Sequence, residues 1–237
     1  MLTFYRAKRI IANKIKDVFN NPQDKILDIG SGISPWYHPI VKGSITKFDS
    51  IEDKHHIDVT GRMENLPFDS ESFDKIICIN ALYYSSNPQK TFSEISRVLK
   101  KNGKVLIVTP FMYPIHDAPH DKFRFTEYAF ESLFAGTCSD IEITPVGGIF
   151  SIPLMLVRSL IKGTPLIFPK FLRKIVMIFL IILMLPIYAL SQLLTALDFA
   201  DNSRRWPTYY IVVAKKNSGF PSKHYLPGSN KAMDTIS

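Results

Sequence analysis

The chain has 237 residues, of which 46% are hydrophobic and 21% charged, with a formal net charge of +8. This length and apolar fraction suit one globular domain with an added element, and they exclude a wholly disordered chain. Two cysteines, Cys78 and Cys138, are too few for a disulfide framework or a cysteine-built zinc cluster, so a reducing, cytosolic compartment is expected. The basic surplus favours a polyanionic partner, either nucleic acid or an anionic membrane face.

The first twenty residues are basic but lack the continuous apolar run and small-residue cleavage site of a secretory signal. Their apolar side chains recur at helical spacing instead. This pattern predicts an amphipathic first helix that ends before Asn21-Pro22.

From residue 24 to about 145, short apolar runs alternate with segments of helical periodicity. The runs indicate strands buried on both faces of a parallel sheet. They lie at residues 26–29, 45–48, 56–59, 75–79, 104–108 and 141–144. Strands that alternate with helices predict an α/β fold with a Rossmann-like, doubly wound sheet.

Two helices are predicted between these strands, at residues 88–99 and 126–134. Asn102-Gly103 is expected to close the helix at residues 88–99, because asparagine and glycine commonly end helices. Thr126 is expected to cap the second, because its hydroxyl can accept a hydrogen bond from a free backbone amide.

Ligands of such sheets bind beyond the carboxyl ends of the strands. A glycine turn with Gly30 and Gly32 follows the first strand, and Asp49 follows the second. Glycines let the backbone approach a ligand closely, and an acid at the end of the second strand can accept hydrogen bonds from both ribose hydroxyls. The two features together favour a nucleoside site over a tight turn with a capping acid.

The glycine turn differs from a nicotinamide fingerprint, which needs a third glycine where Pro35 stands. Asp28, in the strand itself, would repel a pyrophosphate but attract a ligand with an ammonium and a sulfonium. The residues therefore favour S-adenosylmethionine over the cofactor of a nicotinamide-dependent reductase.

The segments ILDIGSG, FDS, ENLPFDSESFDKIICINALYYSSNP and EISRVLKKNGKVLIVTPF resemble the class I S-adenosylmethionine-dependent methyltransferases, most closely the methyltransferase type 11 group. The resemblance covers residues 24 to about 145. It implies a mostly parallel, seven-stranded sheet closed by a last strand at residues 209–214. It also implies a cofactor site in three parts. The methionine part is held by Asp28, Gly30 and Gly32, the ribose by Asp49, and the other side of the cofactor by Asn80 and Ala81.

Two positions depart from the family pattern. Ser34 replaces the third small residue of the glycine loop, and Arg62 stands where many relatives have an acid that contacts the adenine amino group. A guanidinium cannot accept a hydrogen bond. Three explanations stay open: the Met63 backbone binds adenine, Asp58 replaces the acid, or cofactor affinity is weak.

The segment TPFMYPIHDAPHDKFRFT follows the fifth predicted strand and holds two His-Asp pairs. A hydroxyl acceptor needs a base near neutral pKa, so His116 and His120 are candidate bases, with Asp121 as a catalytic partner. Some relatives carry a similar stretch at this point. These side chains could instead cap the next helix and hold the loop by ion pairs. Metal ligation lacks a defined geometry, so no metal site is predicted.

Tyr83 and Tyr84 follow the fourth predicted strand, where many relatives have a Glu-His pair. The two rings could stack on adenine or on an aromatic acceptor. Half-buried packing at the end of the strand explains them equally well.

A hydrophobic insert, residues 146–206, separates the core at residues 1–145 from the final strand at residues 207–216. Its uncharged stretch at 175–197 is long enough to cross a bilayer at about 1.5 Å per residue. A single crossing would place the final strand on the opposite side of the membrane from its sheet. We therefore favour monotopic helices that dip into one leaflet, with a buried helix pair and a transmembrane span as alternatives. A polar tail at 217–237 is predicted to be disordered.

Basic residues flank the apolar stretches, which favours an anionic membrane surface at the cytoplasmic face over nucleic acid. The sequence thus predicts a methyltransferase that uses S-adenosylmethionine to methylate an oxygen or nitrogen of a small hydrophobic or lipid-linked acceptor. The alternative is a non-catalytic, membrane-docked binding or scaffold protein on a degenerate methyltransferase fold.

Overall fold

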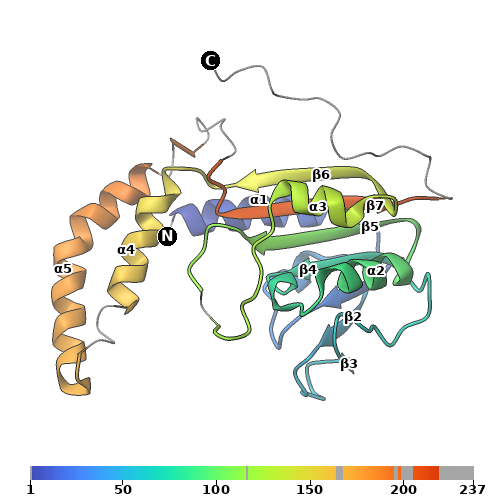
Figure 1. Ribbon diagram of the computed structural model, residues 1–237, viewed down its shortest axis with the longest axis horizontal. Helices are drawn as coiled ribbons and strands as arrows, with labels where there is room; N and C mark the ends of the chain where they lie inside the picture. Colours follow the sequence, from blue (N-terminus) through green and yellow to red (C-terminus); the bar gives the residue numbers. More distant parts are fainter. Residues whose placement is uncertain (1, 116, 164–167, 195–196, 199–204, 219–237) are drawn as a thin grey trace.

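The centre of the molecule is a seven-stranded sheet with the strand order β3-β2-β1-β4-β5-β7-β6 (Figure 1). The computed structural model describes residues 2–115, 117–163, 168–194, 197–198 and 205–218. The strands are β1 (Lys25–Ile29), β2 (Ser44–Asp49), β3 (Val59–Thr60), β4 (Phe73–Ile79), β5 (Leu99–Pro110), β6 (Cys138–Val146) and β7 (Tyr209–Lys216). Only β7 runs antiparallel to its neighbours, so the predicted fold class is confirmed.

Both faces of the sheet are covered, which explains why its strands are almost continuously apolar. Successive residues of a strand point to opposite faces. In β4, Ile76 therefore belongs to the core beneath α2 (Pro88–Val98) and α3 (Glu127–Phe134), while Ile77 belongs to the core beneath α1 (Leu2–Val18).

The helices begin where local capping groups are available. Asn87 caps α2 by accepting a hydrogen bond from the Lys90 amide at 3.1 Å, and Pro88 occupies the first turn. Thr126 caps α3 as predicted, with its hydroxyl 3.2 Å from the Ala129 amide.

The prediction that Asn102-Gly103 closes α2 is wrong. The helix ends at Val98 and β5 begins directly at Leu99. Phe73 pairs with Leu99 and Lys75 with Lys104, so residues 100–103 form a bulge. Asn102 adopts a φ of 62° there, which is the same left-handed conformation that asparagine supplies at a helix end.

Two helices, α4 (Ser151–Gly163) and α5 (Lys170–Leu194), form a hairpin between β6 and β7. Val146 at the end of β6 pairs with Tyr209 at the start of β7, so the hairpin leaves the sheet at one edge. We call this the carboxyl edge; β1, β2, β4 and β5 also end there. At the base of the hairpin the Ser151 hydroxyl contacts the Asp198 carboxylate.

The hairpin projects away from the sheet rather than packing on it (Figure 1). Lys170–Ser191 is the one helical segment of the described residues that is long and apolar enough to cross a membrane, and only 6% of its most apolar window is buried inside the protein. This exposure contradicts the alternative of a buried helix pair for α5, whereas α4 buries Leu154 and Val157. Pro186 lies inside α5.

Candidate active site

Loops at the carboxyl edge enclose a cleft of about 560 Å³, a volume typical of sites for small ligands. The lining residues come from the end of β2 and from the segments that follow the five strands β1 to β5. They are Gly30, Gly32, Phe48, Asp49, Ser50, Ile51, Gly61, Arg62, Met63, Glu64, Asn80, Ala81, Tyr84, Asp117, His120 and Lys122.

The turn after β1 forms one wall of the cleft and needs its glycines for two different reasons. Gly30 and Gly32 have φ angles of 71° and 63°, which side chains rarely adopt. A Cβ on Gly30 would lie 2.1 Å from the Ala81 Cβ, so Gly30 permits close packing of β1 against the loop after β4. A Cβ on Gly32 would meet no atom within 4 Å and would stand in open space at the cleft wall.

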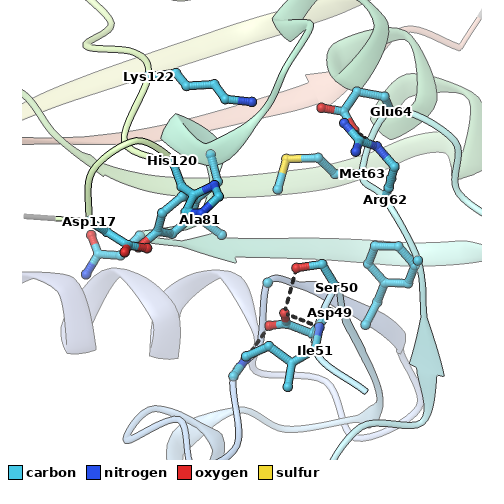
Figure 2. Close-up of a pocket in the computed structure, with 16 residues that line it drawn as sticks. Asp49, Ser50, Ile51, Arg62, Met63, Glu64, Ala81, Asp117, His120 and Lys122 are labelled. Atoms are coloured by element: carbon cyan, nitrogen blue, oxygen red, sulfur yellow. Dashed lines mark hydrogen bonds and ion pairs between the residues drawn. The ribbon is translucent and has the colours of Figure 1, made fainter. Parts of the chain in front are cut away.

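Asp49 ends β2 and lies in the cleft (Figure 2). Its carboxylate accepts hydrogen bonds from the Gly32 amide at 2.8 Å and the Ile51 amide at 3.1 Å. These amides hold the carboxylate in one orientation. The Ser50 hydroxyl also lies 3.5 Å from this carboxylate. Two carboxylate oxygens offer about four acceptor sites, so one remains for a ligand hydroxyl, and a second becomes available when the Ser50 hydroxyl turns away.

Asp28, in contrast, is fully buried behind the turn and does not line the cleft. Both of its oxygens accept from the Tyr37 hydroxyl at 2.9 Å, and His38 Nε2 lies 2.6 Å away. Burial raises the pKa of Asp28, although the hydrogen bonds from His38 and Tyr37 oppose that rise. The structure thus gives Asp28 two protein partners; its prediction as a cofactor ligand stays a prediction.

The loop after β3 closes another side of the cleft through Arg62, Met63 and Glu64 (Figure 2). Arg62 donates to the Ser86 hydroxyl at 2.8 Å and lies 3.4 Å from Glu64. Asp58 accepts from the Lys47 amide at 2.7 Å and does not line the cleft, which argues against Asp58 as a substitute for the missing acid.

Glu64 fixes this loop to the start of α2. It accepts from the Ser86 amide at 2.5 Å, the Ser86 hydroxyl at 2.8 Å and the Ser85 hydroxyl at 3.2 Å. Burial alone would raise the pKa of Glu64, but these hydrogen bonds outweigh it and lower the pKa to about 2. The wall that carries Met63 is therefore held in place by an ionised carboxylate.

The loop after β4 supplies Asn80 and Ala81, both in the cleft. Asn80 has a φ of 54°, and its backbone N–H donates to the Val108 carbonyl at 2.8 Å. The two tyrosines differ in environment. Tyr83 is buried, as expected for packing at the strand end, whereas Tyr84 lines the cleft, where its ring could contact a ligand. Their ring centres are 4.3 Å apart.

The loop after β5 brings His120 to the cleft together with Asp117 and Lys122 (Figure 2). The His120 amide donates to the Asp117 carbonyl at 2.7 Å, which makes a tight turn. His120 faces the cleft from the side opposite Arg62 and Glu64. His116 lies outside the described residues.

The side chain of Asp121 is fully covered within this loop and does not line the cleft. Arg124 contacts both of its carboxylate oxygens and also donates to the Phe123 carbonyl at 2.9 Å. The hydrogen bonds to Asp121 raise the pKa of Arg124. The geometry gives Asp121 a positioning role in the loop; a catalytic role for it stays a prediction.

Several cleft residues were missed by the sequence analysis, among them Phe48, Ser50, Ile51, Glu64 and Lys122. Ser50 and Ile51 directly follow Asp49, so the strand-end rule could have found them. Glu64 and Lys122 reach the cleft through loop geometry, for which the sequence gives no local signal. In the part of the chain that the structure describes, no three His, Cys, Asp or Glu side chains converge as metal ligands.

Residues 27–107 match the family described as "methyltransferase domain". The chain is 29% identical over 139 residues to the uncharacterized methyltransferase YcgJ of Bacillus subtilis, which covers 49% of this chain and 53% of that protein. It is 34% identical over 91 residues to the uncharacterized protein MJ1123 of Methanocaldococcus jannaschii, covering 36% and 44% of the two chains. The chain thus spans about half the length of these curated relatives.

Solved structures share the fold at low sequence identity. The phosphoethanolamine N-methyltransferase 2 of Haemonchus contortus, in complex with S-adenosyl-L-methionine, has a TM-score of 0.54 at 18% identity and covers 88% of this chain and 52% of its own. The [4+2]-cyclase SpnF has a TM-score of 0.55 at 17% identity and covers 89% and 81%. At these identities the likeness shows the fold alone.

Proposed function

We propose that the chain, whose residues 27–107 match the methyltransferase domain family, is a class I S-adenosylmethionine-dependent methyltransferase. We propose further that it methylates an oxygen or nitrogen atom of a hydrophobic or lipid-linked acceptor at a membrane surface. One observation carries the proposal: the cleft and the apolar hairpin share the carboxyl edge of the sheet. A cleft at this edge is within reach of an acceptor held by the hairpin or by the lipid around it.

The cleft fits S-adenosylmethionine on two counts. Open space beside Gly32 leaves room for a ligand against bare backbone, and Asp49 presents an oriented carboxylate in the same cleft. Gly30, Gly32 and Asp49 would hold the cofactor, with Met63, Asn80 and Ala81 along its sides. When bound, S-adenosylmethionine supplies an electrophilic methyl group.

His120 is the proposed general base, because its imidazole lies on the cleft wall and histidine is the side chain that most often serves as a general base in enzymes. It would accept a proton from the acceptor hydroxyl or amine. The remaining contribution of the protein is alignment, since an in-line displacement depends on holding donor and acceptor together.

Membrane docking is supported by the composition of the hairpin and the exposure of α5. Residues 143–197 contain five basic residues and no acidic residue. Lys170 and Lys174, at the start of α5, are exposed beside side chains such as Phe171, which is 76% exposed. A basic, apolar helix of this kind suits the anionic, cytoplasmic face of a membrane. We propose a monotopic arrangement.

The cofactor is tested by calorimetric titration of the detergent-solubilised protein with S-adenosylmethionine. Asp49→Ala should abolish binding, whereas Asp17→Ala, which removes the same charge from the exposed side of α1, should not change it. Binding that survives in Asp49→Ala would contradict the proposed ribose site.

The acceptor is tested with S-adenosylmethionine labelled in its methyl group and a total membrane-lipid extract. Label should enter the organic-extractable fraction, and His120→Ala should remove this transfer while it retains cofactor binding. His55→Ala, a histidine outside the cleft, is the control. Label found only in water-soluble products would refute the hydrophobic acceptor.

A second candidate function is a membrane-docked binding protein without catalysis. Arg62 favours it, because this position in the cleft wall holds a guanidinium instead of a hydrogen-bond acceptor. Folded protein that does not bind S-adenosylmethionine, but binds it in the Arg62→Asp variant, would support this second function.

A further inference from the structure

Exposed apolar side chains outside the hairpin gather at one end of the molecule. Apart from residues 150–198, eight large hydrophobic residues of the described chain are exposed. Seven of them lie in loops of the carboxyl edge: Ile33, Trp36, Ile51, Tyr113, Ile115, Ile149 and Trp206. The eighth, Tyr128, is in the first turn of α3. None lies at the opposite edge, so this distribution is not that of scattered surface residues.

These residues come from loops attached to five different strands. Ile33 and Trp36 follow β1, Ile51 follows β2, and Ile115 follows β5 and is 74% exposed. The exposed face therefore extends along the carboxyl edge from β2 to β6, and one of its members, Ile51, also lines the cleft. A ligand in the cleft could cover only part of it.

The chain's two tryptophans, Trp36 and Trp206, both belong to this face. Trp36 is 37% exposed, and the Lys8 ammonium lies 4.5 Å from the centre of its ring. Tryptophan beside a basic side chain is typical of a membrane–water interface, where the ring meets the headgroups and the cation meets lipid phosphate.

The hairpin lies crosswise to the strands beside the carboxyl edge (Figure 1). Its 25-residue helix α5 is about 37 Å long at 1.5 Å per residue. Seven strands at about 4.8 Å spacing make an edge about 29 Å wide. The helix is therefore long enough to lie along the entire edge.

This geometry distinguishes two ways of placing α5 in a bilayer. With α5 in the plane of the membrane, the strands point at the lipid and the carboxyl edge meets the surface. With α5 across the membrane, Lys170 and Lys174 at the tip would have to pass through, and the edge beside the hairpin would sink into hydrocarbon.

We propose that the carboxyl edge itself is the membrane-facing surface: α5 lies flat in one leaflet, and the loops after β1, β2 and β5 enter the headgroup layer. The cleft then opens toward the lipid, and the acceptor enters from the leaflet rather than from water. This inference rests on the proposed function and names the bilayer as the partner of that site.

Tryptophan fluorescence tests the orientation, because one tryptophan lies far from the hairpin. The Trp206→Phe variant leaves Trp36 as the only tryptophan, in a loop three strand positions from β7. We expect its emission to shift to shorter wavelength with vesicles of phosphatidylcholine and phosphatidylglycerol, and to be quenched when the lipids carry bromine near the headgroup end of their acyl chains. The matched Trp36→Phe variant reports on Trp206, at the hairpin base, which should be quenched in either orientation.

Ile115 offers a second, independent measurement. Its side chain is so exposed that Ile115→Asn should leave the fold intact, yet loss of one isoleucine from the lipid should weaken vesicle binding by about five- to tenfold. A far-ultraviolet circular dichroism spectrum identical to that of the unchanged protein establishes that the variant is folded.

Vesicle-bound protein with Trp36 unquenched and Trp206 quenched would overturn the inference, because the domain would then stand away from the surface. Protein that does not bind vesicles, and that forms a dimer in which Trp36 is shielded, would also overturn the inference, since the carboxyl edge would then bind a second copy of the chain. Quenching of Trp36 in a protein that transfers no methyl group would uphold the orientation and refute only the proposed function.

Discussion

The close approach of Gly30 to Ala81 gives a sharp prediction about stability. In Gly30→Ala the new Cβ would lie 2.1 Å from the Ala81 Cβ, whereas carbon atoms pack at about 3.5–4.0 Å. Ala81 is buried, and the preceding Asn80 amide is bound to the Val108 carbonyl, so the loop cannot simply move away. Overpacking costs about 1–3 kcal/mol and the left-handed conformation about 1–2 kcal/mol. The free energy of unfolding should therefore fall by about 2–5 kcal/mol.

Gly32→Ala is the matched control, because its φ is similar but its Cβ meets no atom within 4 Å. Only the conformational cost of about 1–2 kcal/mol remains. In a domain of this size about 1 kcal/mol moves the Tm by about 2–4 °C, so the two Tm values should differ by several degrees in detergent. Gly32→Ala should instead lose most in affinity for S-adenosylmethionine, since its methyl group enters the cleft wall. Equal Tm values for the two variants would refute the packing argument.

Three further predictions concern single side chains. Glu64→Gln should lower the free energy of unfolding by up to about 3 kcal/mol at pH 7. The pKa of Glu64 is about 2 in the folded protein and 4.5 ordinarily, so the difference between the two proteins should shrink as the pH falls below 4.5. Denaturant titrations that show a constant difference across this pH range would contradict the prediction. Asp121→Asn should destabilise the protein by about 1–3 kcal/mol by weakening the contact with Arg124, with cofactor affinity unchanged; unchanged stability with a large loss of turnover would make Asp121 catalytic instead. Cys78 should resist iodoacetamide at pH 8 until the protein is unfolded, because burial raises its pKa to about 12; alkylation at the rate of a free thiol would show that the core opens.

Most of the fold could be predicted from the sequence because buried parallel strands must be apolar on both faces. The runs that became β1, β4 and β5 were visible for that reason. β3 has only two residues, so periodicity says little about its bounds. Asn102-Gly103 misled the prediction because a left-handed residue serves a bulge as well as a helix end.

The site was predictable where it depends on strand ends and not where it depends on partners distant in sequence. Gly30 and Asp49 follow strands, so their place at the carboxyl edge follows from the topology. Asp28 also lies in a strand, but its partners Tyr37 and His38 come from a loop whose path the sequence does not reveal. The bonds from Ser85 and Ser86 to Glu64 likewise join segments that meet only in the folded chain.

The place of β7 in the sheet has a consequence for how the protein is made. β7 inserts between β5 and β6, yet it is synthesised last, after the whole hairpin. At about 5–20 residues per second, the ribosome needs several seconds between the end of β6 and the start of β7. Because α4 and α5 precede β7 in the chain, they leave the ribosome before it, while β5 still lacks a neighbour on one side. If the hairpin binds lipid as proposed, it should therefore reach the membrane before the sheet closes, and folding of the sheet would be completed there.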